Sequence, residues 1–597
     1  MNSQSSTATD SNRLSYSVDE NPGNKLSASL GLQAAVLMIS GIALTPVIVL
    51  RGADADPSLH GWVIFAALLV SGVTTWLQGR PFWILGSGYA LFMGTSGAFI
   101  AVGIAAVQSG GLSLLATLAA VSALFQFAFA ARLHWFRRVI TPEVGGVVVM
   151  LIVVTVFPIC ANLMNDVSPE HSDFPAAATA GVTFLITTGL ALLGRGKWRL
   201  WGPFIGLVAG CSMAAAFDLF SVRPIISARW IGLPETAWPG MDLSFGAAFW
   251  ALLPGFVIVT LVGAIETYGD AISIQSVSHR QRKPIDFRVI QKALYTDGLG
   301  NFLSGMLGTL PNTTYSTSIS LVEFTGVAAR RVAMFGGIVY VILAFFPKIS
   351  ALLQVIPNPV VGAYLLVLLA ILFISGLRLV AEGGLDYEKG LIVSLSFWVG
   401  IAFQNQMVFP ELLTDWMHAL LDNGMTAGGL CAMILNGLMA IFQKGGDTIW
   451  FSPSRHPFPM LRAFIRSQGQ RAGWSDDAIQ RCELVGEEAL LYLRNGVLTA
   501  KEKTRLSIVM EKETAHLEFS TGVETPNLAA EIQSLEPEPV NVENEAGLRI
   551  LRAMAATVNH QQFGNRSFLM LSVASSDREN ISKHDDKDWP LNNPPNQ

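Results

Sequence analysis

The sequence predicts an all-α polytopic membrane protein, built from fourteen spans as a 7+7 inverted repeat, with a small α+β domain after it. Three observations predict this fold class. The 597 residues are 51% hydrophobic and only 14% charged, a composition outside the range of soluble globular domains. The apolar residues gather into runs long enough to cross a bilayer. Segments in the first half of these runs also resemble segments in the second half.

Composition divides the chain into four parts. Residues 1–27 are polar and have no apolar core of a signal peptide, so we expect a disordered N-terminal arm. Residues 28–445 form the membrane domain. Charged residues return from Asp447 onward, and residues 446–576 have the composition of a small cytoplasmic α+β domain. Residues 577–597 are charged and rich in Pro and Asn, which predicts a disordered tail.

A spanning helix needs about 20 apolar residues, and this requirement predicts fourteen spans. They lie near 29–50, 61–78, 82–107, 111–131, 141–163, 174–194, 199–217, 247–276, 290–309, 312–328, 331–347, 349–377, 388–404 and 425–443. Lys and Arg are concentrated in the loops that follow even-numbered spans. The positive-inside rule therefore places both termini in the cytoplasm. The expected location is the cell inner (plasma) membrane.

The two halves share a repeat. The start of the fifth span, ITPEVGGVVVMLIVVTVF, parallels the start of the twelfth, IPNPVVGAYLLVLLAILF, and places Pro142 and Gly145 opposite Pro359 and Gly362. Because seven is odd, the second copy must cross the membrane in the opposite direction. This inverted arrangement is typical of secondary transporters.

The third and tenth spans are irregular at matching places. Gly88-Tyr89-Ala90 and Thr314-Tyr315-Ser316 interrupt the apolar pattern ahead of a helix. Paired interrupted spans mark the binding site of such transporters. The alternative is that small residues here serve only close helix packing.

Acidic side chains inside the spans point to a site, because a charge in a bilayer is costly without a function or a partner. Glu266 and Asp270 are four residues apart in the eighth span, so they share one helical face. Asp297 begins the ninth span. The alternative is a structural hydrogen-bond network. Glu323 is expected to meet Arg330 or Arg331.

Other chemistries have little support. The four cysteines show no CxxC spacing, which excludes a cysteine zinc site. A net charge of −5 gives no basic excess for nucleic acid. No histidine lies in the middle of a span, so proton chemistry must rest on carboxylates. We expect no cofactor and no enzymatic activity.

The membrane domain resembles the nucleobase/ascorbate transporters, also called xanthine/uracil permeases. The resemblance rests on four stretches in the right order: TPEVGGVVVMLI in the fifth span, IETYGDAISIQSVS in the eighth, YTDGLGN in the ninth and LPNTTYSTSISLVEFTGVAAR in the tenth. It implies a core domain (spans 1–4 and 8–11), a gate domain (spans 5–7 and 12–14), and short strands in spans 3 and 10.

The resemblance also implies roles for individual residues. Glu266 would make a bidentate hydrogen bond to a base. Asp270, Asp297 and Gln33 would support it or carry protons, and Tyr89 would stack on the ring. The remaining substrate-binding positions would be Gly88, Ala90, Ser316, Thr317 and Ser318.

The tenth-span signature departs from the family pattern. Thr317-Ser318-Ile319-Ser320 stands where the family has an acid or amide, an Asn and a Gly. Ala34 follows Gln33, where many members have His. Hydroxyls reach less far than a carboxamide, so specificity for uracil or xanthine does not carry over.

The C-terminal part resembles the anti-sigma-factor type of the histidine-kinase-like ATPase fold. Helices are expected over 462–474, 475–496 and 546–558, and strands over 505–512, 515–522 and 567–575. Tyr492 replaces the magnesium-binding Asn and Ser520 replaces the adenine-reading Asp. A small α+β domain without nucleotide is therefore the favoured alternative.

Together these features predict a proton-coupled importer of a nucleobase or similar planar solute, working as a homodimer in the lipid bilayer. An anion transporter of the sulfate-permease type shares the seven-plus-seven architecture, but it needs no buried acid at its site. A solute sensor that signals through its C-terminal domain is the third possibility.

Overall fold

The computed structural model describes most of the chain in two compact units. The described residues are 14–132, 141–165, 173–195, 197–220, 222–280, 283, 285–382, 387–408, 411, 421, 423–442, 447–451, 457–495, 503–511, 513–522, 527–535, 542–563 and 566–575. Unit 1 comprises Met1–Gln281 and Val289–Gly437, and unit 2 comprises Arg282–Arg288 and Leu438–Gln597. The predicted boundary at 445/446 and the predicted tail 577–597 lie outside the described residues.

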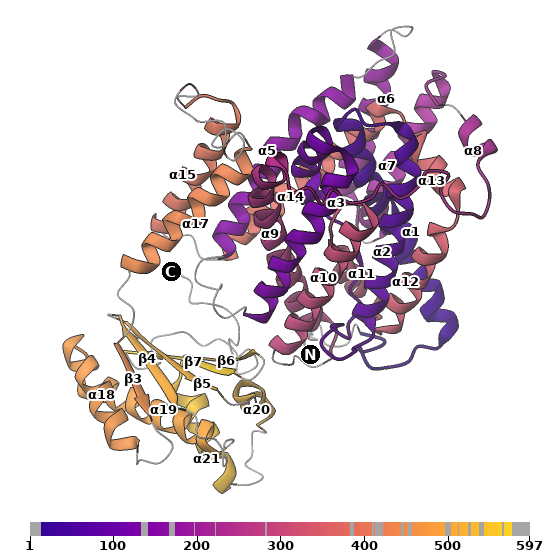
Figure 1. Cartoon of the computed structure of the whole chain (residues 1–597). Helices are drawn as coiled ribbons and strands as arrows, with labels where there is room; N and C mark the ends of the chain where they lie inside the picture. The colour runs from indigo at the N-terminus through magenta and orange to yellow at the C-terminus, as the bar shows by residue number, and fades with distance from the viewer. Residues whose placement is uncertain are drawn as a thin grey trace, which may run out of the picture. The chain divides into compact units, whose positions relative to one another are not determined.

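Unit 1 is helical apart from two short strands (Figure 1). Its first half contains α1 (Asn24–Gly52), η2 (Pro57–Leu59), α2 (His60–Gly79), β1 (Met93–Thr95), η3 (Gly97–Phe99), α3 (Ile100–Ala131), α5 (Pro142–Asn165), α6 (Asp173–Leu193), α7 (Lys197–Ala216) and α8 (Arg223–Ser227). Its second half contains α9 (Ala247–Val277), α10 (Phe287–Leu307), β2 (Asn312–Thr314), α11 (Thr317–Thr325), α12 (Arg331–Ala344), α13 (Pro347–Gln354), α14 (Asn358–Glu382), α15 (Tyr387–Gln404) and α17 (Gly424–Phe442).

Seven helices of the described chain are long and apolar enough to cross a membrane, or eight if the bent pair of α12 and α13 is one span. The predicted third and fourth spans meet inside α3, which breaks at Gly110 and Gly111; Gly111 has a φ of 71°. The long helix predicted as the twelfth span, over 349–377, starts later than predicted. The first residues of that range belong to the short α13, which is bent by 81° from α12, and the long helix α14 starts at Asn358. Pro347 and Pro357 account for these breaks.

The helices of unit 1 form two sets that pack mainly within themselves. One set contains α1, α2, α3, α9 and α12, and the other contains α5, α6, α7, α14 and α15. Glycines allow close approach within each set. A Cβ on Gly72 of α2 would lie 2.7 Å from the carbonyl oxygen of Gly337 in α12, and one on Gly146 of α5 would lie 2.6 Å from that of Gly376 in α14. These sets agree with the expected core and gate groups of spans.

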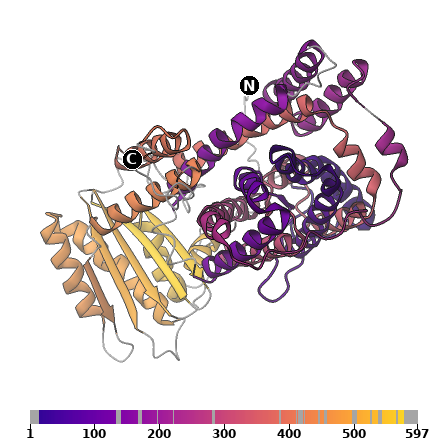
Figure 2. The ribbon, with the colours of Figure 1, turned by 45° about the horizontal axis from the view of Figure 1, so that its top comes forward.

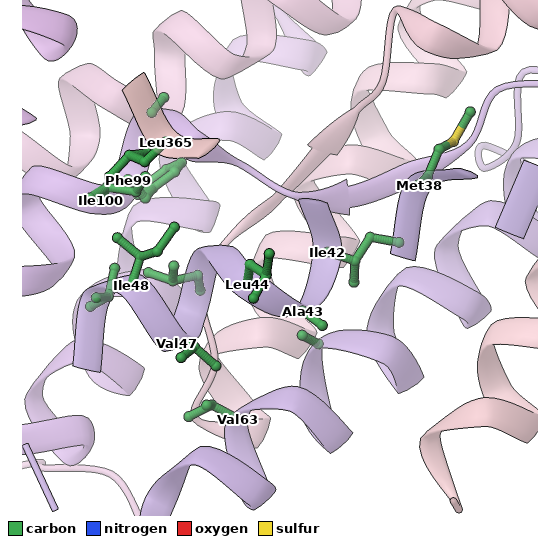
Figure 3. Close-up of a cluster of buried hydrophobic side chains, with 14 of the residues drawn as sticks. Met38, Ile42, Ala43, Leu44, Val47, Ile48, Val63, Phe99, Ile100 and Leu365 are labelled. Atoms are coloured by element: carbon green, nitrogen blue, oxygen red, sulfur yellow. The ribbon is translucent and has the colours of Figure 1, made fainter. Parts of the chain in front are cut away.

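The apolar core of unit 1 gathers around α1. Side chains of α1 such as Ile42 and Ile48 lie with Val63 of α2, Phe99 of η3 and Leu365 of α14, and all are buried (Figure 3). Because lipid tails are as apolar as these side chains, close van der Waals packing between the helices stabilises this core. The core therefore fixes the elements that lead into and out of β1.

The two short strands pair with each other, which confirms the expected strands of the third and tenth spans. β1 and β2 are antiparallel, with Met93 opposite Thr314 and Thr95 opposite Asn312. The strand of the third span begins at Met93, after the interrupted segment Gly88–Ala90 rather than within it. Helices α5 and α14 also run antiparallel, because Gly146 near the start of α5 meets Gly376 late in α14. An inverted repeat would require this direction, and the repeat itself stays a prediction.

The prediction of a disordered arm over residues 1–27 is wrong for the part that the structure describes. Residues 14–23 run along unit 1 as an extended segment, and α1 begins at Asn24. Tyr16 forms a parallel bridge with Val327. The polar composition of this segment indicated disorder, but its backbone groups find partners on unit 1. Residues 1–13 lie outside the described chain.

Unit 2 is an α+β fold with a five-stranded antiparallel sheet (Figure 2). The strand order is β3-β4-β5-β7-β6. Its elements are β3 (Asp447–Phe451), α18 (Phe458–Arg471), α19 (Asp476–Asn495), β4 (Thr504–Met510), β5 (Thr514–Thr521), α20 (Leu528–Ser534), α21 (Val542–Met554), β6 (Thr557–Phe563) and β7 (Arg566–Ala574). Alternate residues of β5, including Leu517 and Phe519, face a buried core against the helices. The sequence did not predict β3, α20 or β6.

Candidate functional site

The carboxylate of Asp270 joins α9 to the end of β2. It is buried and accepts hydrogen bonds from the hydroxyls of Thr314 and Ser316, each at 2.7 Å. Both oxygens of Asp270 are therefore used by the protein itself. Ser316 lies next to the first residue of α11, so this carboxylate also fixes where α11 starts. This position fits the supporting role expected for Asp270.

Asp297 lies in a second polar cluster between α9, α10 and α3. Its Oδ2 accepts hydrogen bonds from Thr267 Oγ1 at 2.9 Å and from Gln126 Nε2 at 2.6 Å. Asn301 donates to the side-chain oxygen of Gln126 and accepts from the backbone N–H of Asn312 at 2.6 Å, so the cluster reaches β2. Asp297 Oδ1 is buried and has no hydrogen-bond partner among the described residues. Sequence reasoning missed Gln126, since a lone amide in an apolar span carries no motif.

Glu266 lies one turn before Asp270 and differs from it in burial and in hydrogen bonding. The side chain is half-buried, and within the described part of the chain no hydrogen bond or ion pair reaches its carboxylate. Its neighbour Ile265 packs against Gly145 of α5, where a Cβ would lie 3.1 Å away. Glu266 therefore sits between the residues of α9 that face β2 and those that face the other helix set. A carboxylate here has both oxygens available as acceptors.

Tyr315 lies beside β1 because two glycines leave room for its ring. A Cβ on Gly94 would lie 2.5 Å from its Cζ, and one on Gly41 of α1 would lie 3.2 Å from its hydroxyl. The hydroxyl donates to the carbonyl of Thr95 at 3.0 Å. The ring thus locks β1 to β2 in addition to the strand hydrogen bonds.

The structure places Tyr89 away from Glu266. Its hydroxyl lies 3.0 Å from His279 Nε2, and the two rings are in edge contact at 5.9 Å. His279 follows the end of α9, about 20 Å along that helix from Glu266. Gly88 and Ala90 lie in the same connection between α2 and β1, and Gly88 donates to the carbonyl of Gln78 at 2.8 Å. The stacking of Tyr89 on a substrate ring stays a prediction.

The remaining predicted residues have mixed positions. Ser318 is buried, and its Oγ accepts a hydrogen bond from the backbone N–H of Phe92 at 2.9 Å, so it supports β1. Thr317 begins α11 and is half-buried. Gln33 is half-buried on α1, about 12 Å along that helix from Gly41.

Glu323 does not meet its expected partners. Arg330 pairs with Asp19 at 3.5 Å, and Arg331 donates to the side chain of Asn21 at 2.9 Å. Among the described residues there is also no group of three or more His, Cys, Asp or Glu side chains that could hold a metal ion.

Sequence comparison identifies the family. A family model named for xanthine and uracil permeases, and described as the permease family, matches residues 26–408. The chain belongs to the xanthine/uracil permease family. The match covers every element of unit 1 that carries the residues described above.

Named relatives agree with this assignment. The xanthine permease XanP of Escherichia coli is 27% identical over 455 residues, which cover 73% of this chain and 96% of XanP. A putative purine permease of Clostridium perfringens is 26% identical over 430 residues, covering 71% of this chain and 93% of that protein. This permease is therefore a membrane transporter and not an enzyme.

Solved structures of other transporters are more distant. The murine anion transporter SLC26A9 in its inward-facing state aligns with 72% of this chain and 71% of its own, at 11% identity and a TM-score of 0.49. This likeness is too low to support anion transport by this permease.

The part of unit 2 from Leu438 onward lies beyond the family match, and two glutamates of α19 form ion pairs. Glu487 pairs with Arg462, and Glu483 pairs with Arg466 at 2.9 Å. Burial and the neighbouring Glu487 raise the pKa of Glu488. Tyr492 packs against the core of the unit. These contacts favour a domain that does not use the glutamates for nucleotide chemistry.

Proposed function

We propose that this permease imports a nucleobase or a similar planar solute together with protons, by alternating access of a core and a gate domain. The observation that carries the proposal is Glu266. In the described structure its carboxylate has no internal partner, although it lies beside a polar network in which Asp270 and Asp297 are hydrogen-bonded. We further propose fourteen spans in a 7+7 inverted repeat, cytoplasmic termini, a cytoplasmic unit 2 and a homodimer.

The chemistry of a nucleobase suits a free carboxylate. Xanthine, urate and uracil are flat rings with N–H donors at their edges, and a carboxylate can accept one such donor, or two where the base presents two side by side. Charge-assisted hydrogen bonds of this kind contribute about 1.5–3 kcal/mol each. The hydroxyl of Thr317, at the start of α11, is the nearest replacement for the family acid or amide. We therefore expect a different preference among bases from that of relatives with the full signature.

Proton coupling is supported by the two aspartates. Asp297 is fully buried, and no cation pairs with it among the described residues. A buried carboxylate without a counter-charge is costly, so a proton is its natural partner. Asp270 is also buried and receives only neutral hydroxyl donors. Protonation of either group would change the bonds that hold β2 and α10 to α9. We assign Gln33 to this supporting group as well.

Uptake measurements test the proposal. The permease is expressed in a bacterium that lacks its own purine and pyrimidine uptake, and labelled xanthine, hypoxanthine, urate and uracil are supplied in turn. We expect accumulation of at least one base and loss of accumulation when a protonophore is added. Accumulation that needs sodium and survives the protonophore would contradict proton coupling. No accumulation of any base by a correctly inserted protein would contradict the substrate class.

A further inference from the structure

The N-terminal strap, residues 14–24, pairs with the segment that follows α11. The backbone N–H of Tyr16 donates to the carbonyl of Gly326 at 3.1 Å, and the carbonyl of Tyr16 accepts from Ala328 N at 2.9 Å. Farther along, the carbonyl of Val18 accepts from Arg330 N at 3.2 Å. Tyr16 and Val327 form a single parallel β-bridge, and Val18 adds one more backbone hydrogen bond beyond it. The strap therefore covers the link between α11 and α12.

The same strap also holds the end of α9. Val18 N and Ser17 Oγ both donate to the carbonyl of Ser278, at 3.3 and 3.1 Å. Arg280 reaches back to the strap and donates to the carbonyl of Ser15 at 3.0 Å and to the carboxylate of Glu20 at 2.8 Å. One extended segment thus bonds to the ends of two helix systems that are distant in sequence.

These two systems carry the candidate site. Helix α9 holds Glu266 and Asp270, and α11 starts directly after Ser316, which donates to Asp270. Next to Ser278, the ring of His279 contacts Tyr89, which precedes β1. The segment Ser278–Arg280 is therefore the point where α9, the approach to β1 and the strap meet. β1 is joined to this point through Tyr89, and β2 through α11, Gly326 and the strap.

We propose that the N-terminal strap is a conformational clamp that fixes α9 relative to α11 and β1, and so sets the affinity of the substrate site. The expected effect on substrate affinity rests on the proposed function, whereas the fixing of α9 relative to α11 and β1 does not. Asp270 already links α9 to β2 at the level of the site, and the strap adds a second link at the helix ends. Two separated links prevent α9 from pivoting about Asp270. Loss of the strap should therefore loosen the site without unfolding the permease.

Two truncations test the clamp. Deletion of residues 2–22 removes most of the strap, and deletion of residues 2–13 is the matched control that leaves it in place. Hydrogen–deuterium exchange is measured on the purified full-length protein and both truncations. We expect faster exchange in peptides covering Ser278–Arg280 and Gly326–Arg331 only in the longer deletion. Unchanged exchange there would overturn the clamp, whatever the substrate proves to be.

The consequence for transport is measured with labelled xanthine in cells. In the longer deletion we expect KM to rise several-fold while the amount of inserted protein stays the same, and we expect the shorter deletion to match the full-length chain. Faster exchange with an unchanged KM would overturn the effect on affinity. If the full-length chain does not transport xanthine or another base, the proposed function fails, and the exchange result still decides the structural part.

A charge exchange provides a second test that removes no backbone. Glu20→Arg and Arg280→Glu each place like charges together, whereas the double variant restores opposite charges. We expect faster exchange at Ser278–Arg280 in both single variants and partial recovery in the double variant, because the carbonyl contacts of Arg280 are not restored. The pair is partly exposed, so the effect should shrink at high salt. Single variants that behave as the unmodified protein would overturn the role of this ion pair.

Discussion

Glu266→Gln and Asp270→Asn should affect this permease in opposite ways. Glu266 has no internal hydrogen-bond partner in the described structure, so its replacement by Gln breaks no bond within the protein. An amide keeps one acceptor and turns an N–H₂ group toward the donors of the base. Losing one charge-assisted hydrogen bond costs about 1.5–3 kcal/mol, which is roughly a tenfold to hundredfold loss of affinity. Thermal stability without substrate should stay unchanged.

Asp270→Asn should show the reverse pattern. Thr314 and Ser316 each donate to this carboxylate at 2.7 Å. Asn offers one acceptor, so one hydroxyl must rotate and accept instead, and a charge-assisted bond becomes a neutral one. The change costs about 1 kcal/mol of stability. The loss of affinity should be much smaller than for Glu266→Gln, because Asp270 reaches the substrate only through Ser316.

Purified variants in detergent decide between the two patterns. Thermal unfolding is followed with and without a transported base, and the dissociation constant is obtained by titration of that base. Glu266→Gln should keep the melting temperature of the ligand-free protein and lose the shift caused by the base. Equal losses of affinity in both variants, or a large loss of stability in Glu266→Gln alone, would refute the division of roles and would favour a purely structural network.

Three further predictions concern other parts of the chain. Gly94→Ala should lower the free energy of unfolding by about 1–3 kcal/mol and impair uptake, because the added Cβ would collide with Tyr315. Gly97→Ala is the control, because its Cβ would meet nothing within 4 Å. Similar melting temperatures for the two variants would contradict the packing of this ring. His560 accepts from Leu528 N, and burial lowers its pKa from 6.5 to about 4. The unfolded chain therefore binds a proton more readily than the folded chain. The free energy of unfolding should fall when the pH is lowered from 7 to 5, and it should fall less in His560→Asn. Calorimetric titration of the full-length protein with Mg-ATP should show no binding to unit 2; micromolar binding would contradict this expectation.

The sequence predicted the fold of unit 1 well where composition and periodicity act over long stretches. Long apolar runs identified α1, α5, α9 and α14, and paired interruptions identified the two crossing strands. Prediction from the sequence failed where backbone hydrogen bonds to residues far along the chain outweigh local composition. The polar strap is ordered by carbonyls and amides at Gly326 and Ser278, and no property of residues 14–23 indicates those partners. The edge strand β3 of unit 2, which pairs with the distant β4, was missed for the same reason, whereas β6 pairs with its neighbour β7 in a hairpin.

The acidic residues of the site were predictable because a carboxylate in an apolar span is rare and costly. Their connections were not predictable. Gln126 is joined to Asp297 across α3 and α10, which needs the packing of two helices to be known. Tyr89 was assigned to the substrate by resemblance, but the fold turns the connection before β1 toward His279. Position in a motif indicated the element, whereas the contact of Tyr89 with His279 depends on the fold.

The hydroxyls in the tenth-span segment explain how the site can work without the usual acid or amide there. Thr314 and Ser316 each donate to one oxygen of Asp270, so this buried carboxylate is already engaged within the protein. Ser318 supports the backbone before β1. Asp297 Oδ1 and Asn312 Oδ1 also lack partners among the described residues, but both side chains are buried, whereas Glu266 is half-buried beside the strand pair. One carboxylate can orient one N–H edge of a base, and the opposite edge must be read by Thr317 or by backbone groups. Discrimination between bases should therefore depend less on charge in the tenth span than on the shape left around Tyr315.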